Sequence, residues 1–218
     1  MQLNTVIFDM DGLLIDSEPL WNEAAAIIFN RYNIKLTPQQ YASTTGMRTK
    51  EFLNWWFTAF KIAIPDITLI EKDLIDIVKD LIVQKGKPMP GLSHIFNFFD
   101  ERNFKMGLAS SSPLHLINVV VDLLQLRPHL KAITSAEALK YGKPHPEVYL
   151  NCASQLNVAP SACICFEDSF PGMISAKAAG MKCVVVPDFK TSKSLKWHAA
   201  DLKISSLQNF NNLLLQSI

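Results

Sequence analysis

The sequence predicts an α/β fold in which a Rossmann-like parallel sheet is interrupted by an inserted helical domain. Short, mostly apolar runs recur along the chain and alternate with segments of helical periodicity, the pattern of βαβ units around a parallel sheet. Residues 17–85 break this alternation, because they hold helical periodicity and no strand-like run. We therefore expect an α/β core formed by residues 1–15 and 88–218 and a helical cap formed by residues 16–87.

The composition excludes several classes of protein. With 218 residues, 49% of them hydrophobic and 19% charged, the chain can bury a sizeable core and is not disordered. A net charge of +1 offers no basic surface, and no apolar run approaches the roughly 18–20 residues that span a bilayer. The N-terminus lacks the basic region of a signal peptide, and the four cysteines form no C-x-x-C pair. We expect no nucleic-acid partner, no membrane partner and a reducing, cytoplasmic location.

The first expected strand, residues 5–8, runs directly into the sequence Asp9-Met10-Asp11-Gly12. In an extended chain the side chains at i and i+2 point to the same side, so Asp9 and Asp11 can converge, and Gly12 lets the backbone turn. The carboxyl ends of strands are where open α/β sheets bind ligands. Taken alone, the motif fits an exposed, Asp-rich turn equally well.

The insert follows, and it is rich in aromatic residues. Trp55, Trp56, Phe57 and Phe60 lie close together near its middle, and we expect them to pack inside the insert rather than to form a binding site. Residues 85–91, with two prolines and two glycines, are typical of a linker that returns the chain to the sheet.

The remaining patterns complete the core. Pro113 follows three serines and opens a helical pattern, which is a typical helix start. The expected strands are 105–109, 163–166 and 183–186, with weaker candidates at 132–134 and 202–204, and the expected helices are 113–124, 146–156 and 172–179.

Three polar motifs follow these elements. Ser110, Ser111 and Ser112 follow the second expected strand, where hydroxyls can cap a helix and can also, with the N–H groups of the helix start, bind an anion. Lys143 lies in a Gly-Lys-Pro turn, a place where most lysines are solvated charges. Glu167 and Asp168 form a second acidic pair at the end of a strand, although an N-cap would explain Asp168 as well. Together with the first motif they supply a nucleophile, a cation site and donors for phosphoryl oxygens.

Charge counting supports a metal at this site. The carboxylates of Asp9, Asp11, Glu167 and Asp168 outnumber the ammonium of Lys143, so a phosphate dianion would be repelled unless a divalent cation were bound. Mg²⁺ suits carboxylate, carbonyl and water ligands. Crowded carboxylates should also raise the pKa of one of them, as a general acid requires near neutral pH.

These motifs resemble those of the haloacid dehalogenase (HAD) superfamily of phosphotransferases, in the β-phosphoglucomutase-like branch with a helical cap. The resemblance covers essentially the whole chain. The segments LLIDSEPLW (13–21), ASSSPLH (109–115) and GKPHPEVYL (142–150) further resemble the bacterial hexitol and 2-deoxyglucose-6-phosphate phosphatases. The resemblance implies a HAD-like core with an inserted α-helical cap, a monomer, and Mg²⁺-dependent hydrolysis of small sugar or sugar-alcohol phosphates.

The resemblance also implies roles for matching residues. Asp9 would attack phosphorus and form an aspartyl phosphate, and Asp11 would protonate the leaving oxygen and then activate water. Ser110, with the backbone around Ser111, would hold phosphoryl oxygens, and Lys143 would neutralise the negative charge of both the phosphoryl group and Asp9.

The implied metal site overlaps with these residues. Asp9, Asp168 and the backbone carbonyl of Asp11 would ligate Mg²⁺. Glu167 would either orient Lys143 or bind a water molecule coordinated to the metal.

In the cap, the segment Thr45-Gly46-Met47-Arg48 matches the loop that reaches the active site in this branch. Gly46 and Arg48 are therefore expected to contact substrate, although a solvated surface arginine is the alternative for Arg48. Glu18 and Trp21, on the first cap helix, are expected to line the same space.

Trp21 also bears on the type of reaction. β-Phosphoglucomutase has a cap histidine at the position that aligns with Trp21, where it helps to control the acid–base group. An indole cannot exchange a proton in that role, which favours hydrolysis over a mutase. A phosphosugar mutase remains the first alternative, and a non-catalytic phosphosugar sensor or phospho-acceptor domain is the second.

Overall fold

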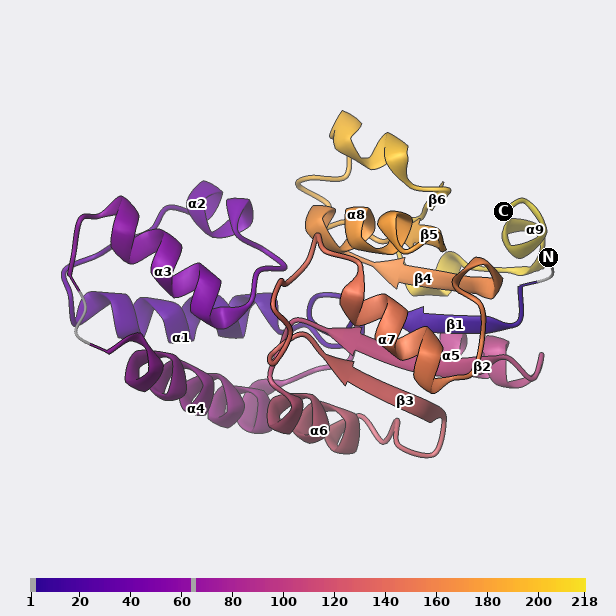
Figure 1. The fold of residues 1–218 in the computed structure, drawn as a ribbon, viewed down its shortest axis with the longest axis horizontal. Coiled ribbons are helices and arrows are strands. Elements are labelled where there is room, and N and C mark those ends of the chain that lie inside the picture. Colours follow the sequence, from indigo (N-terminus) through magenta and orange to yellow (C-terminus); the bar gives the residue numbers. More distant parts are fainter. Residues whose placement is uncertain (1–2, 64–65) are drawn as a thin grey trace.

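The structure is a computed structural model that describes residues 3–63 and 66–218. A six-stranded parallel sheet forms its centre, in the order β3-β2-β1-β4-β5-β6 (Figure 1). The strands are β1 (Thr5–Phe8), β2 (Lys105–Ser110), β3 (Leu130–Ser135), β4 (Cys163–Glu167), β5 (Lys182–Val185) and β6 (Leu202–Lys203). The predicted Rossmann-like α/β fold is confirmed.

Strand β1 lies in the middle of the sheet and is buried on both faces. Val6 and Phe8 contribute to one hydrophobic cluster and Ile7 to the other, as the alternation of side chains along a strand requires. Because both faces are covered, the strand consists of one continuous apolar run. Phe8 pairs with Leu108 on β2 and with Phe166 on β4. The carboxyl ends of these three strands therefore lie side by side, where the strand order reverses.

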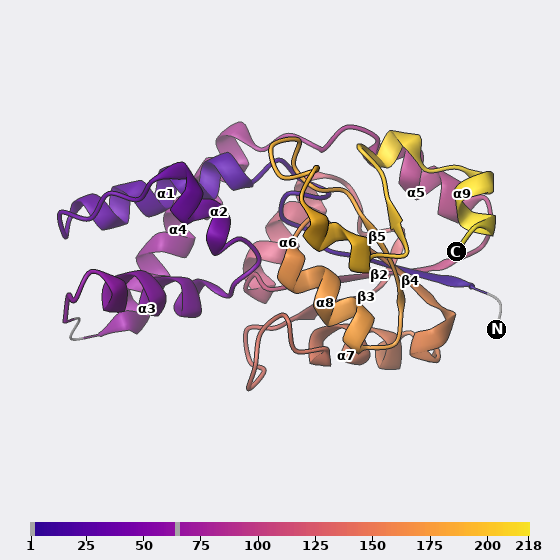
Figure 2. The same ribbon diagram turned by 90° about the horizontal axis from the view of Figure 1, so that it is seen from above.

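Helices cover both faces of the sheet (Figure 2). Helices α5 and α6 belong to the hydrophobic cluster on the side of Phe8, and α7 and α8 belong to the cluster on the side of Ile7. Helix α5 was not among the elements that the sequence predicted. The core helices are α5 (Leu92–Asp100), α6 (Leu114–Leu123), α7 (Glu147–Gln155), α8 (Phe170–Ala178) and α9 (Asn212–Gln216), with 3-10 turns at Pro160–Ala162, Leu195–Ala199 and Leu207–Asn209.

Between β1 and α5 the described residues form four helices, which lie beyond the end of the sheet toward which β1 and β4 run (Figure 1). They are α1 (Glu18–Asn30), α2 (Pro38–Ser43), α3 (Thr49–Ala59) and α4 (Ile67–Lys85). Phe29, Leu53, Phe57 and Leu74 are fully buried among them and hold the group together. The linker predicted at residues 85–91 connects α4 to α5.

The prediction that the aromatic residues of α3 and the adjoining Phe60 all pack inside the insert is wrong for two of them. Trp56 and Phe57 are buried, but Trp55 is 56% exposed and Phe60 is 39% exposed. Residues one position apart on a helix do not share a face, so a single helix cannot bury the whole run against one neighbour.

Across residues 3–63 and 66–218, the helices are too short or too polar to cross a bilayer.

Candidate active site

The carboxyl ends of β1, β2 and β4 bring together most of the residues that the sequence singled out. Asp9 follows β1, Ser110 is the last residue of β2, and Asp168 follows Glu167, the last residue of β4. With Lys143, which comes from the segment between β3 and α7, the four residues Asp9, Ser110, Lys143 and Asp168 line one cavity of about 90 Å³. Asp11, Ser111, Glu18, Trp21 and Gly46 line the same cavity.

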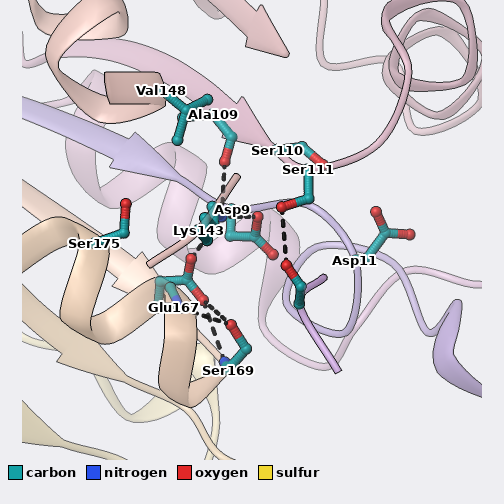
Figure 3. A network of polar contacts seen from close by, with 12 residues as sticks. Asp9, Asp11, Ala109, Ser110, Ser111, Lys143, Val148, Glu167, Ser169 and Ser175 are labelled. Atoms are coloured by element: carbon teal, nitrogen blue, oxygen red, sulfur yellow. Dashed lines mark hydrogen bonds and ion pairs between the residues drawn. The ribbon is translucent and has the colours of Figure 1, made fainter. Parts of the chain in front are cut away.

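Lys143 forms the centre of the network at the base of this cavity (Figure 3). Its Nζ donates to Asp9 Oδ1 at 2.6 Å, to Glu167 Oε1 at 2.7 Å and to the carbonyl of Ala109 at 3.2 Å. Its side chain is 1% exposed, so this lysine is not the solvated charge that loop lysines usually are. Burial alone would lower the pKa of Lys143, but the carboxylates of Asp9 and Glu167 raise it above its usual range. The ammonium is therefore a permanent positive charge against Asp9.

The carboxylates around Lys143 fit a divalent cation. Oxygens of Asp9, Glu167 and Asp168 lie within 4.8 Å of one another. Burial raises the pKa of Asp9 to about 8, with Lys143 opposing and Glu167 adding to the shift. Burial and then the Asp9 carboxylate raise the pKa of Asp168 well above its usual range. The single ammonium of Lys143 therefore does not compensate the negative charge of this cluster. A hard cation with oxygen ligands would compensate it.

Glu167 is the most completely bonded member of the cluster. Oε1 accepts hydrogen bonds from Lys143 and from the Tyr149 hydroxyl, and Oε2 accepts from the N–H and the hydroxyl of Ser169. A carboxylate has about four lone-pair positions, and these four donors occupy them. Gly172 leaves room for this arrangement, because a Cβ there would lie 1.8 Å from Glu167 Oε1. The contacts support the role of orienting Lys143, whereas the role of Glu167 at a metal stays a prediction.

Asp11 is held apart from the Lys143 network, and Figure 3 shows its carboxylate turned away from Asp9. Oδ1 accepts from the Ser17 hydroxyl at 2.6 Å and from Trp21 Nε1 at 2.9 Å, and Oδ2 accepts from the Ser112 hydroxyl at 2.7 Å. Trp21 belongs to α1 and Ser112 follows β2, so donors from the insert and from the core both fix this side chain. Neither Ser17 nor Ser112 was predicted to contact Asp11, although both stand within the segments LLIDSEPLW and ASSSPLH.

The serines after β2 contact the cavity rather than cap α6. Ser110 Oγ accepts the N–H of Ser112 at 3.0 Å, and Ser111 donates to the carbonyl of Gly46 at 2.9 Å. The first N–H of α6, that of Leu114, donates instead to Glu137 at 3.1 Å. In α8, by contrast, Ser169 is the N-cap and leaves Asp168 free to face the cavity.

The structure does not bring Arg48 to the cavity. Its Nη1 donates to the carbonyls of Ala136, at 3.3 Å, and Leu139, and its Nη2 pairs with Glu51. These carbonyls belong to the segment that follows β3, which turns the guanidinium toward the core surface. Gly46, two residues earlier, does line the cavity.

Comparisons with known proteins agree with this geometry. A family model of haloacid dehalogenase-like hydrolases matches residues 6–186. Hexitol phosphatase B from Escherichia coli (strain K12) is 37% identical over 207 residues, covering 94% of this chain and 93% of its own. A phosphorylated carbohydrates phosphatase from Thermotoga maritima is 30% identical over 195 residues, covering 88% and 90%. A solved β-phosphoglucomutase from Clostridium difficile has the same fold, with a TM-score of 0.86 and 23% identity over 99% and 96% of the two chains.

Proposed function

Because the chain belongs to the haloacid dehalogenase-like hydrolases and is a phosphoric monoester hydrolase, we propose that it is a Mg²⁺-dependent phosphatase of small sugar or sugar-alcohol phosphates. One observation carries the proposal: a buried ammonium, that of Lys143, is bonded to Asp9 at the base of a cavity that Asp168 also lines. A carboxylate, a fixed positive charge and a cation site in one enclosed space are the parts that phosphoryl transfer needs. The names of the two phosphatase relatives support the choice of substrate class.

In the proposed first step, Asp9 is the nucleophile. Lys143 donates a hydrogen bond to Oδ1 of Asp9, whereas no described residue donates one to Oδ2. A new bond forms between Oδ2 and phosphorus, the ester P–O bond breaks, and the sugar oxygen leaves with a proton from Asp11. Lys143 neutralises charge on the transferred group, while the Ser110 hydroxyl and the N–H groups near Ser111 hold its other oxygens.

In the proposed second step, Asp11 accepts a proton from a water molecule that attacks the aspartyl phosphate. A bond forms between the water oxygen and phosphorus, the bond between phosphorus and Asp9 Oδ2 breaks, and inorganic phosphate and the free Asp9 carboxylate result. Ser17, Trp21 and Ser112 orient Asp11 through the three hydrogen bonds that it accepts. A carboxylate that is held from several sides keeps one geometry through both proton transfers.

Asp9, Asp168 and the backbone carbonyl of Asp11 are the ligands that we propose for Mg²⁺. When bound, the cation would neutralise phosphoryl charge and offset the buried carboxylates. Gly12 allows the close approach of Asp168, because a Cβ at Gly12 would lie 2.2 Å from Asp168 Oδ2.

We further propose that residues 16–87 act as a cap over the core, in a monomer that works in a reducing compartment such as the cytoplasm. The contact from Ser111 to Gly46 and those from Arg48 to Ala136 and Leu139 join the two parts. Four free, buried cysteines support the reducing compartment. Trp21 supports hydrolysis over a mutase, because its indole N–H positions Asp11 but does not transfer protons at neutral pH.

The test is phosphate release from 2-deoxyglucose 6-phosphate, hexitol phosphates and β-glucose 1-phosphate, with Mg²⁺ or with EDTA. We expect release that requires Mg²⁺ and that is lost in Asp9→Asn. The matched control Asp80→Asn changes an exposed carboxylate on α4 and should leave release unchanged. Conversion of β-glucose 1-phosphate to glucose 6-phosphate without release would instead identify a mutase, and a long-lived phosphoprotein without turnover would identify a phospho-acceptor.

A further inference from the structure

The cavity has a phosphoryl end and a cap end that differ in their side chains. Asp9, Lys143 and Asp168 surround the phosphoryl end. The cap end is lined by residues from α1, α2 and the turn after it, among them Glu18, Asn22 and Thr45, and Glu18 lies where the two ends meet, close enough to Asp168 to raise the pKa of that carboxyl. A phosphate ester bound with its phosphoryl group at Asp9 therefore places its leaving group among these cap residues.

The part of the chain that the structure describes brings no positive side chain to the cap end. Among the described residues that line the cavity, Lys143 is the one cation, and both Asp9 and Glu167 already use its ammonium. Arg48 stands in the turn before α3, but its guanidinium bonds to carbonyls of the core and to Glu51. A second phosphate or a carboxylate on the leaving group would find no counter-charge there.

A neighbouring groove beyond Thr49 and Ser111 does contain cations, but acidic residues face them. Lys72 donates to Asp76 at 2.7 Å, and although burial raises the pKa of Glu71, Lys50 lies close enough to that carboxyl to oppose the rise. These lysines therefore do not supply an unpaired charge to a substrate in the cavity.

Glu18 makes the cap end unfavourable for anions. Its carboxylate accepts one long hydrogen bond, from the Thr45 hydroxyl at 3.5 Å. Burial and then the neighbouring Asp11 carboxylate raise the pKa of Glu18 to about 7. The same desolvation and the same negative neighbours would act on a carboxylate or phosphate of a substrate placed beside it. A hydroxyl or an ammonium, by contrast, can donate to Glu18.

Binding of a divalent cation and a phosphate ester does not remove the excess of negative charge in the cavity. A divalent cation and a phosphoryl dianion bring equal and opposite charges to the phosphoryl end. Four acidic side chains, Asp9, Asp11, Glu18 and Asp168, line the cavity against the one ammonium of Lys143, so negative charge stays in excess even while Asp11 holds the proton that it gives to the leaving oxygen.

We propose that the cap end selects phosphate esters whose leaving group is uncharged or carries an ammonium, and that Glu18 is the specificity-determining residue that rejects leaving groups with a second negative charge. This inference rests on the proposed phosphatase function, because it names the substrate class of the same cavity. Hydroxyls of the leaving group would donate to Glu18, and the amide of Asn22 lies beside the same space.

The test compares two substrates that differ at one carbon. Sorbitol 6-phosphate carries a CH₂OH group where 6-phosphogluconate carries a carboxylate, and the rest of the two molecules is the same. With Mg²⁺ at pH 7.5 and low salt, we expect kcat/KM to be about 100-fold higher for sorbitol 6-phosphate, the size of effect that a like-charge contact in an enclosed site produces. Glucosamine 6-phosphate should be hydrolysed at least as well as glucose 6-phosphate.

The variant Glu18→Gln keeps the shape of the side chain and removes its charge. We expect the ratio of kcat/KM for sorbitol 6-phosphate to kcat/KM for 6-phosphogluconate to fall about tenfold in this variant. A tenfold change is the size expected when one charge–charge contact that solvent partly screens is removed. Glu23→Gln, an exposed glutamate on the same helix, is the matched control and should keep the wild-type ratio. Circular dichroism confirms that each variant is folded.

The outcomes separate the inference from the function on which it rests. If neither sugar phosphates nor p-nitrophenyl phosphate release phosphate, the proposed function fails. If phosphate is released from sorbitol 6-phosphate and 6-phosphogluconate at similar kcat/KM, the function stands and the charge selection is refuted. If the wild-type ratio is high but a folded Glu18→Gln keeps it, the assignment to Glu18 is refuted. The wild-type comparison decides the selection by itself should the variant not fold.

Discussion

Replacing Lys143 with methionine tests the electrostatic core of the site without any substrate. The change keeps a long apolar side chain and removes the ammonium that Asp9 and Glu167 share at 2.6 and 2.7 Å. The side chains of these three residues are 9% exposed or less, so water cannot replace the lost charge. Removing one partner of a buried ion pair costs about 3–5 kcal/mol. That is a large part of the roughly 5–15 kcal/mol that a domain has in total.

The assay is urea denaturation followed by circular dichroism, in EDTA at pH 8 and at pH 5.5. We expect Lys143→Met to lose about 3–5 kcal/mol of unfolding free energy at pH 8 and less at pH 5.5, where the Asp9 carboxyl is protonated. Lys140→Met, an exposed lysine three residues earlier, should change stability by about 0.5 kcal/mol or less. A loss below about 1 kcal/mol at pH 8 in Lys143→Met would refute the view that this ammonium compensates buried charge.

Three further predictions concern the same network. Asp9→Asn should abolish phosphate release with an unchanged circular dichroism spectrum, and substantial remaining activity would overturn the assignment of the nucleophile. The pKa of Asp9 is raised from 3.8 to about 8, so the folded protein binds the extra proton between these values and metal-free stability should fall as pH rises, by at most about 1.4 kcal/mol per pH unit. Denaturation of wild type and Asp9→Asn in EDTA across pH 4–8 measures this, and parallel curves would contradict it. Tyr149→Phe removes a buried hydrogen bond to Glu167 and should lower the unfolding free energy by about 1–3 kcal/mol, whereas an unchanged midpoint in urea would show that the bond contributes nothing.

Much of the candidate site could be predicted because the positions of its residues depend on local sequence patterns. The position of Asp9 follows from a buried apolar run that ends in D-x-D-G, and those of Ser110 and Asp168 follow from two more runs that end in polar residues. In a parallel sheet these ends share one edge, so periodicity and strand order together place the three residues close to one another.

Other features of the site were not predictable from such patterns. Tyr149 looks like a core residue of α7, and its hydroxyl could have met any buried acceptor. Arg48 stands in a segment that matches a substrate loop, yet its donors meet carbonyls of residues 136 and 139. Long side chains with several donors bind whichever acceptors the packed elements bring within reach.

The sequence by itself determined the alternation of strands and helices, the helical insertion after the first strand and the polar residues at the strand ends. These depend on burial periodicity and on neighbours a few positions apart. Only the tertiary structure decided that Lys143 bonds to Asp9, 134 positions away, that Ser112 binds Asp11, and that Lys143 is the one cation among the described residues that line the cavity with Glu18. Such contacts depend on how separate elements pack against one another. A pattern along the sequence indicates which face of an element a residue occupies, but it does not identify the partner that the residue contacts there.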